Sequence, residues 1–290
     1  MTATTATPSP STATPRTATT TTLVTHEWLR TRGPLATLFG LIALVGVVGS
    51  LLGASGWPLL SPLGMALGFL AAVAAVPATQ LVLAADYWRS GYGRTGYFTH
   101  SLPIRGARIY RVKLAWAMLA SLAAIVLTVI LALVAWWAFA RISEAPGPSW
   151  AGLVDLWDAV TAAAPAWMIV AGVLVMLAWV LVWPVFYYFS VSIGHERRLA
   201  GLGAGGPIVV FVLVYIAMQA LSLLGMAVLP FGVRMGDEVG LVSFNLVDEL
   251  AAGANTGDVM PIGFIGAMVL LAGFCMWRTA RSWNRNVSLG

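Results

Sequence analysis

Only a few side chains in this sequence have the types and spacing that enzyme chemistry requires. His195 and Glu196 open like the His-Glu-x-x-His helix of zinc hydrolases, but Leu199 stands where the second histidine would be. His100 and Asp86 complete the acid, base or ligand candidates that a membrane-embedded, lipid-modifying enzyme could use. We therefore expect no catalytic residues and no metal-binding residues.

Nucleotide chemistry is also missing from the chain. A phosphate-binding P-loop has the pattern Gly-x4-Gly-Lys-Ser/Thr, and the single lysine, Lys113, is not preceded by it. The chain is therefore not expected to be an ATPase or another enzyme by itself, and we expect it to bind no cofactor.

The composition is that of a membrane protein. Hydrophobic residues make up 59% of the 290 residues and charged residues 9%, with a mean hydropathy of +0.86. Six apolar segments are long enough to cross a bilayer, which takes about 20 helical residues. In lipid such segments must satisfy their own backbone polar groups, so they are expected to be helices. The predicted fold class is all-α, with six transmembrane helices at about 34–53, 62–86, 114–140, 163–192, 207–229 and 259–277.

Ionisable side chains are missing from the interior of these six segments. Asp86 lies at the inner end of the second segment, so a proton relay through the bilayer has no groups to use. Gln80 and Gln219 are the main strongly polar side chains nearer the interior, and we expect both to make helix–helix hydrogen bonds.

The remaining parts of the chain have distinct compositions. The Thr/Pro/Ala-rich residues 1–22 cannot bury enough apolar surface to order, and we expect disorder there. Residues 23–33 suit an amphipathic helix in the membrane interface, or an ordinary flank of the first span. An amphipathic helix is expected within 141–161, and 230–258 forms an outer loop before the tail 278–290.

Charge is distributed unequally between the two sides of the predicted membrane. Fourteen of the 16 Lys and Arg residues lie in the N-terminal segment, the 86–113 loop, the 194–206 loop and the tail. The opposite side has Arg141 and Arg234 together with most of the acidic residues. Cytoplasmic segments carry the excess of Lys and Arg, so both termini and the 86–113 loop are predicted to be cytoplasmic.

The 86–113 loop combines six basic residues with six aromatic ones, more than any other connection. One interpretation is a topogenic loop whose arginines bind anionic lipid. The other is a docking surface, because Tyr, Trp and Arg are enriched at binding hot spots. Nucleic acid is a poor third partner for so short a membrane-tethered loop, and we expect none.

The stretch GYGRTGYFTHSLPIRGARIYRVKLAW, residues 91–116, resembles the membrane subunits of type 2 ATP-binding-cassette exporters. The match includes the Gly-Tyr-x-Thr-x-Ser-Leu-Pro order before a basic segment and a lysine that opens the third span. The six-span layout and the long outer connection between the fifth and sixth spans are also similar to that family.

The resemblance implies a function and a set of contacts. It implies a permease (exporter) subunit of the bacterial plasma membrane that pairs, as a homodimer or heterodimer, with a second such subunit and binds an ABC ATPase subunit, which holds the ATP. A cytoplasmic coupling helix at about 89–100 would contact the ATPase through Arg89, Tyr92, Arg94, Tyr97, Phe98 and His100. The interfacial helix would brace this contact through Glu27, Trp28, Arg30 and Arg32.

On the outer side, the resemblance implies a short helix from Asn245 towards Leu250 that closes the pathway. The apolar and aromatic spans favour a hydrophobic or amphipathic cargo. A secondary transporter and a membrane-embedded lipid-modifying enzyme remain the alternatives.

Overall fold

A computed structural model describes residues 19–93, 104–142, 150–196, 199–234, 239–245 and 258–285. Within them, six helices are long and apolar enough to span a membrane, which confirms the predicted multi-pass helical architecture. These are α1 (Thr20–Gly53), α2 (Leu60–Gly91), α4 (Gly106–Ile142), α6 (Ala166–Gly194), α7 (Gly205–Val228) and α9 (Phe264–Arg285).

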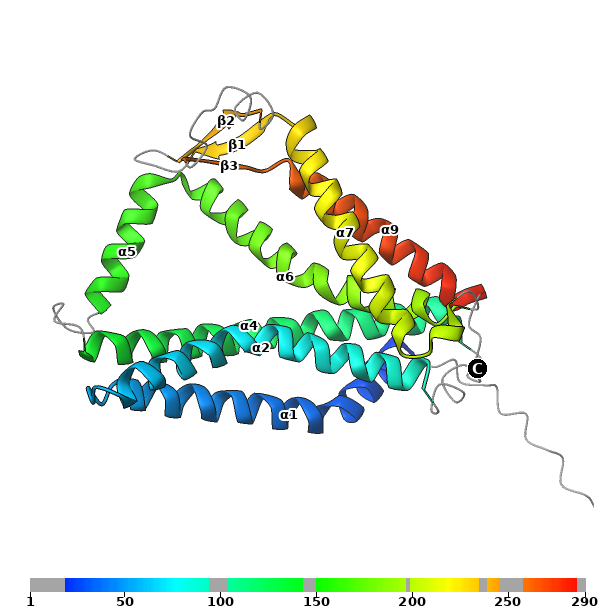
Figure 1. The fold of residues 1–290 in the computed structure, drawn as a ribbon, viewed down its shortest axis with the longest axis horizontal. Helices are drawn as coiled ribbons and strands as arrows, with labels where there is room; N and C mark the ends of the chain where they lie inside the picture. Colours follow the sequence, from blue (N-terminus) through cyan, green and yellow to red (C-terminus); the bar gives the residue numbers. More distant parts are fainter. Residues whose placement is uncertain are drawn as a thin grey trace, which may run out of the picture.

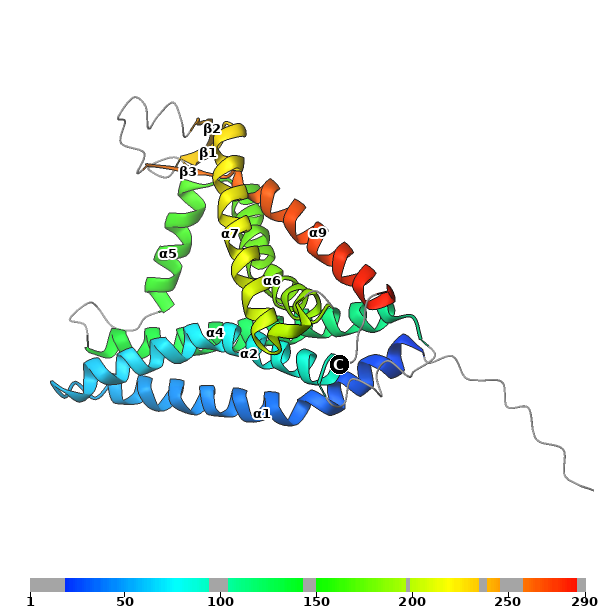
Figure 2. The same ribbon diagram turned by 45° about the vertical axis from the view of Figure 1, so that its right-hand side comes forward.

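The six long helices form two groups of three. Helices α1, α2 and α4 pack on one another, and α6, α7 and α9 form the second group. Contacts of α2 with α6 and of α4 with both α6 and α9 join the groups. The two groups meet at one end and diverge towards the other, where α5 (Trp150–Ala163) connects them (Figures 1 and 2).

Glycines allow the closest helix contact within the first group. A Cβ atom on Gly49 would lie 2.7 Å from the backbone nitrogen of Gly68, and one on Gly64 would lie 2.6 Å from the carbonyl oxygen of Gly49. Both contacts are with backbone atoms, which cannot move aside as a flexible side chain can. The small-xxx-small spacings Gly49-Gly53 and Gly64-Gly68 therefore pack α1 against α2 of the same chain.

Helices α1, α2 and α4 extend further than the sequence predicted. Helix α1 begins at Thr20 and continues through Pro34, so residues 23–33 are continuous with the first span, and residues 20–22 of the tail predicted to be disordered are helical. The darkest blue part of α1 points away from the axis of the rest (Figure 2), and Pro34 accounts for the bend because it leaves the carbonyl of Arg30 without its helical partner. Helix α2 continues to Gly91 and α4 begins at Gly106, so helices occupy both ends of the predicted 86–113 loop.

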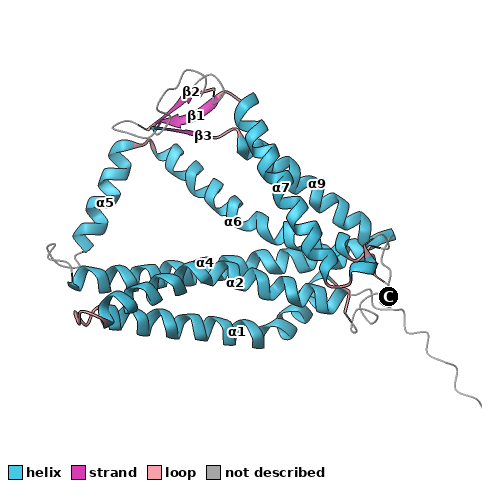
Figure 3. Cartoon of the chain, in the orientation of Figure 1, coloured by secondary structure: helices cyan, strands magenta, loops and turns pink. Residues whose placement is uncertain are grey.

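The side predicted to be external contains structure that the sequence pattern only partly predicted. The predicted amphipathic helix within 141–161 is present as α5, whereas the predicted fourth span begins only at Ala166. A small antiparallel sheet in the order β2-β1-β3 was not predicted (Figure 3). Its strands are β1 (Phe231–Arg234), β2 (Gly240–Ser243) and β3 (Val259–Pro261), and β3 occupies what was taken as the start of the sixth span.

Burial is concentrated where the two groups meet. The inner half of α6, from Val182 to Gly194, is mostly buried, whereas its outer half contains no buried residue. The core cluster draws on the inner ends of α2, α4, α6 and α9. The molecule is therefore held together mainly at the end where the predicted cytoplasmic segments emerge.

Candidate functional site

A buried ion pair joins the inner ends of α1 and α4. Lys113 is 2% exposed, and its Nζ donates hydrogen bonds to Glu27 Oε1 at 2.8 Å and to Ser90 Oγ of α2 at 3.0 Å. An ammonium ion this deeply buried is stable only when it is paired and hydrogen-bonded. Lys113 therefore fixes the relative positions of three helices at one point.

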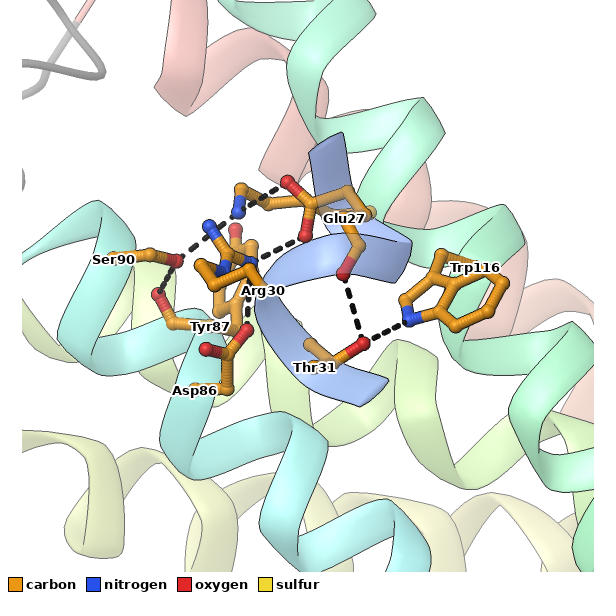
Figure 4. A network of polar contacts seen from close by, with 8 residues as sticks. Glu27, Arg30, Thr31, Asp86, Tyr87, Ser90 and Trp116 are labelled. Atoms are coloured by element: carbon orange, nitrogen blue, oxygen red, sulfur yellow. Dashed lines mark hydrogen bonds and ion pairs between the residues drawn. The ribbon is translucent and has the colours of Figure 1, made fainter. Parts of the chain in front are cut away.

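A second ion pair completes the network. Arg30 of α1 donates to Asp86 Oδ2 of α2 at 2.6 Å and also pairs with Glu27, one turn earlier (Figure 4). Lys113 and Arg30 thus balance the charges of Glu27 and Asp86. The desolvation of each charge is offset by a partner from another helix.

The same turn of α1 is fixed on its other side by α4. Trp116 Nε1 donates to Thr31 Oγ1 at 2.9 Å, and Thr31 in turn donates to the carbonyl of Glu27 at 2.8 Å (Figure 4). The ring of Trp28 meets that of Trp116 edge-on, with 5.7 Å between centroids. The first turns of α1 therefore move with α2 and α4.

A tyrosine links this network to the second helix group. Tyr87, next to Asp86, is fully buried and stacks on Tyr188 of α6, with 3.9 Å between ring centroids. Its hydroxyl lies 2.7 Å from Ser192 Oγ of α6 and accepts a hydrogen bond from Trp283 Nε1 of α9. Tyr87 thus connects α2 to α6 and α9 at the level of the ion pairs.

A ring cluster extends this junction to the end of α2. His195 Nδ1 lies 2.8 Å from the carbonyl of Val191 and must donate to it, while His195 Nε2 accepts a hydrogen bond from Trp88 Nε1 at 2.9 Å. These partners define the neutral ring protonated on Nδ1. Tyr92 stacks on His195 at 4.9 Å. Burial raises the pKa of Tyr92 to about 12, so its phenol is uncharged at neutral pH.

Polar contacts also hold the ends of α6, α4 and α9 together. Glu196 accepts hydrogen bonds from Arg278 Nη2 at 2.7 Å and from Ser282 Oγ at 2.8 Å. Asn284 Oδ1 accepts the backbone N–H of Ala107 at 3.0 Å, which satisfies one of the free donors of the first turn of α4.

Further into the bilayer, Gln80 of α2 joins both groups. Pro184 has no backbone N–H, so the carbonyl of Val180, four residues earlier in α6, lacks its helical hydrogen bond. Gln80 Nε2 donates to that carbonyl at 2.9 Å and to Ser121 Oγ of α4 at 3.3 Å. This confirms the expected helix–helix role of Gln80. Gln219 differs, because it donates to Tyr215 of its own helix, α7, at 3.1 Å.

Of the predicted brace residues, Glu27, Trp28 and Arg30 contact α2 or α4, whereas Arg32 is exposed. Of the predicted docking residues, Arg89 is exposed at the end of α2. Tyr92 instead packs against the core, with its hydroxyl buried. The other four, Arg94, Tyr97, Phe98 and His100, lie outside the described residues, as does the helix expected from Asn245 towards Leu250.

The candidate catalytic residues are occupied by structural contacts. Asp86 pairs with Arg30, His195 bonds to Trp88 and Val191, and Glu196 binds α9, while His100 lies outside the described residues. In the part of the chain that the structure describes, no three His, Cys, Asp or Glu side chains group as metal ligands would.

Sequence reasoning missed the roles of Lys113 and Tyr87. Lys113 was predicted to open the third span, but its pairing with Glu27 was not predicted. A lysine at the start of one apolar span and a glutamate just before another are a pairing signal in a chain with so few charges. Tyr87 carried no comparable signal.

The fold and this junction define a helical, multi-pass membrane protein in which polar contacts at one end hold two helix groups together. No protein-family model, curated protein or solved structure matches the chain.

Proposed function

We propose that the protein is the membrane subunit of an ABC exporter and that the segment between α2 and α4 binds a separate ATPase subunit. The observation that carries the proposal is the double anchoring of that segment. Helix α2 ends at Gly91, four residues after Tyr87, and α4 begins at Gly106, seven residues before Lys113. Through Asp86, Tyr87 and Lys113, these two helices contact three others, α1, α6 and α9.

Such anchoring suits the transmission of force. A partner that pulls on the segment would displace α2 and α4 together with the start of α1, because the ion pairs resist separation of these helices. Tyr87 and Gln80 would pass the displacement to α6 and α9. A rigid-body rotation of one helix group relative to the other is the type of motion that opens a membrane pathway alternately to its two sides.

The proposal includes a second permease subunit, as a homodimer or heterodimer, in the bacterial plasma membrane. Its support is the outer half of α6, which contains no buried residue and exposes Val170, Val173 and Leu174. The cargo would be hydrophobic or amphipathic, because the two long helix groups carry few charges outside their ends.

The test is coupling to an ATPase. When the protein is purified from solubilised membranes of the native host, a nucleotide-binding subunit should copurify with it. The ATPase activity of that subunit should depend on the membrane protein. The double substitution Arg89→Glu and Arg94→Glu should lower the recovered ATPase about tenfold or more, as loss of a binding hot spot does. The matched control is Arg141→Glu with Arg234→Glu, the same charge change on the side predicted to be external.

Unchanged recovery and unchanged ATPase activity in the Arg89/Arg94 variant would overturn the proposal. Transport in vesicles that contain the protein alone and are driven by an ion gradient would instead establish a secondary transporter.

A further inference from the structure

A cavity of about 340 Å³ opens between the two helix groups at Gln80. It is lined by Val76, Pro77 and Gln80 of α2 and by Trp179, Trp183 and Tyr187 of α6. This volume lies within the range of small-molecule sites in proteins, about 300–1,000 Å³, and the lining has their usual mixture of aromatic groups and a single amide.

The aromatic side chains of the cavity are supported from behind. Tyr187 stacks on Phe211 of α7, with 5.4 Å between centroids, and Trp179 meets Phe264 of α9 edge-on at 5.8 Å. Trp183 packs edge-on against Phe186 at 6.2 Å. Rings held by their neighbours lose little freedom when a ligand binds, which favours a flat, aromatic ligand.

The hydrogen-bonding state of Gln80 restricts the ligand further. The Val180 carbonyl is only an acceptor, so the Gln80 atom that faces it is the amide nitrogen, and both of its N–H groups are directed to Val180 and Ser121. Gln80 is 3% exposed, and no described residue donates to its Oε1 atom. An acceptor on the cavity lining that receives no hydrogen bond from the described residues favours a ligand that brings a donor.

Charge restricts the ligand as well. Among the described residues, no Lys, Arg, His, Asp or Glu lines the cavity, so an ionised ligand would lose its hydration without gaining a partner. The cavity is therefore suited to an uncharged molecule.

We propose that this cavity binds an uncharged, membrane-soluble phenol or aromatic alcohol, whose ring packs among Trp179, Trp183 and Tyr187 and whose hydroxyl donates to Gln80 Oε1. The inference goes beyond the exporter proposal, because binding here requires neither an ATPase nor transport.

The test is binding of 4-phenylphenol to the purified protein in lipid nanodiscs, measured by equilibrium dialysis against empty nanodiscs of the same lipid. The empty discs correct for partition into lipid. We expect saturable binding, with affinity about fivefold or more weaker for the methyl ether, which keeps the ring but lacks the donor. The carboxylate 4-phenylbenzoate should not bind measurably.

Two variants locate the site. Val76→Trp adds a bulky ring to the cavity lining and should abolish saturable binding. The control Leu81→Trp adds the same side chain to α2 at a position that is 54% exposed and outside the cavity lining, and it should bind as the wild type does. Gln80→Met should remove the preference for the phenol over its ether.

Equal affinity for the phenol and its ether in the wild type, or saturable binding retained in Val76→Trp, would overturn the proposal. These two measurements do not depend on Gln80→Met, so the proposal stays testable if that variant fails to fold. Loss of ATPase coupling in the Arg89/Arg94 variant would leave phenol binding unchanged, which separates this proposal from the exporter proposal.

Discussion

Four charged side chains meet where α1, α2 and α4 approach one another, and their charges sum to zero. Glu27 is shared between Lys113 and Arg30, and Arg30 also binds Asp86. Because Lys113 and Glu27 are both buried, the loss of either leaves its partner with an uncompensated charge. The energetic consequence depends on the balance of the network more than on any single contact.

We therefore expect Lys113→Met and Glu27→Leu each to lower the free energy of unfolding by about 3 kcal/mol, the cost of breaking a buried pair from one side. The double variant restores neutrality, retains Arg30–Asp86 and should recover most of that loss. Reversible chemical unfolding in detergent micelles would measure all three. Arg108→Met is the control, since Arg108 makes an exposed hydrogen bond to Thr20 and its loss should cost less than about 0.5 kcal/mol. Additive losses in the double variant would contradict a coupled pair.

At the scale of the elements, close contact between α1 and α2 depends on four glycines. Gly49 and Gly53 of α1 face Gly64 and Gly68 of α2 so closely that backbone atoms touch. The spacing is the one that also dimerises transmembrane helices, but here it is used within the chain. The partner subunit that we propose would therefore have to use another surface.

Gly64→Ala should accordingly lower the free energy of unfolding by about 1–3 kcal/mol, because the new methyl group forces two backbones apart. Gly40→Ala, also in a helix, meets nothing within 4 Å and should leave stability unchanged or raise it, by up to about 1 kcal/mol. Thermal unfolding of both variants in the same detergent would compare them. If Gly64→Ala abolished self-association while monomer stability stayed the same, these glycines would be an intermolecular contact instead.

The sequence was sufficient for the spans but not for their ends. Long apolar segments predict membrane helices because lipid requires every backbone group to be bonded within the segment. Outside lipid that requirement ends, and the extension of α2 to Gly91 depends on Trp88 and Tyr92 packing against α6. The strands β1, β2 and β3 are three or four residues long, too short for a periodic signal. A glutamine within an apolar span predicted that Gln80 makes a hydrogen bond between helices. Its partner could not be predicted, because only the fold brings Gln80 next to the Val180 carbonyl that Pro184 leaves unpaired.

At the scale of the whole molecule, the polar contacts and the basic segments occupy the same end. The described ends of α1, α2, α4, α6 and α9 meet through Arg30–Asp86, Ala107–Asn284 and Arg278–Glu196, and towards the other end the two helix groups diverge from each other (Figure 1). Arg141 and Arg234 belong to the diverging ends. We expect the end at which the two helix groups meet to face the cytoplasm, because Lys and Arg are retained on the cytoplasmic side of a membrane.

This orientation can be tested without altering any charge, because the only native cysteine, Cys275, is fully buried and should not react. Gly201→Cys, on the exposed turn before α7, should react with a membrane-impermeant maleimide only after the cells are permeabilised. Ser243→Cys in β2 and Ala162→Cys in α5, both exposed, should react in intact cells. The reverse pattern would place the junction outside, where no ATP is available, and would remove the basis for ATPase docking. Labelling of all three in intact cells would contradict the six-span topology, because one crossing separates Gly201 from each of the other two sites, α6 from Ala162 and α7 from Ser243.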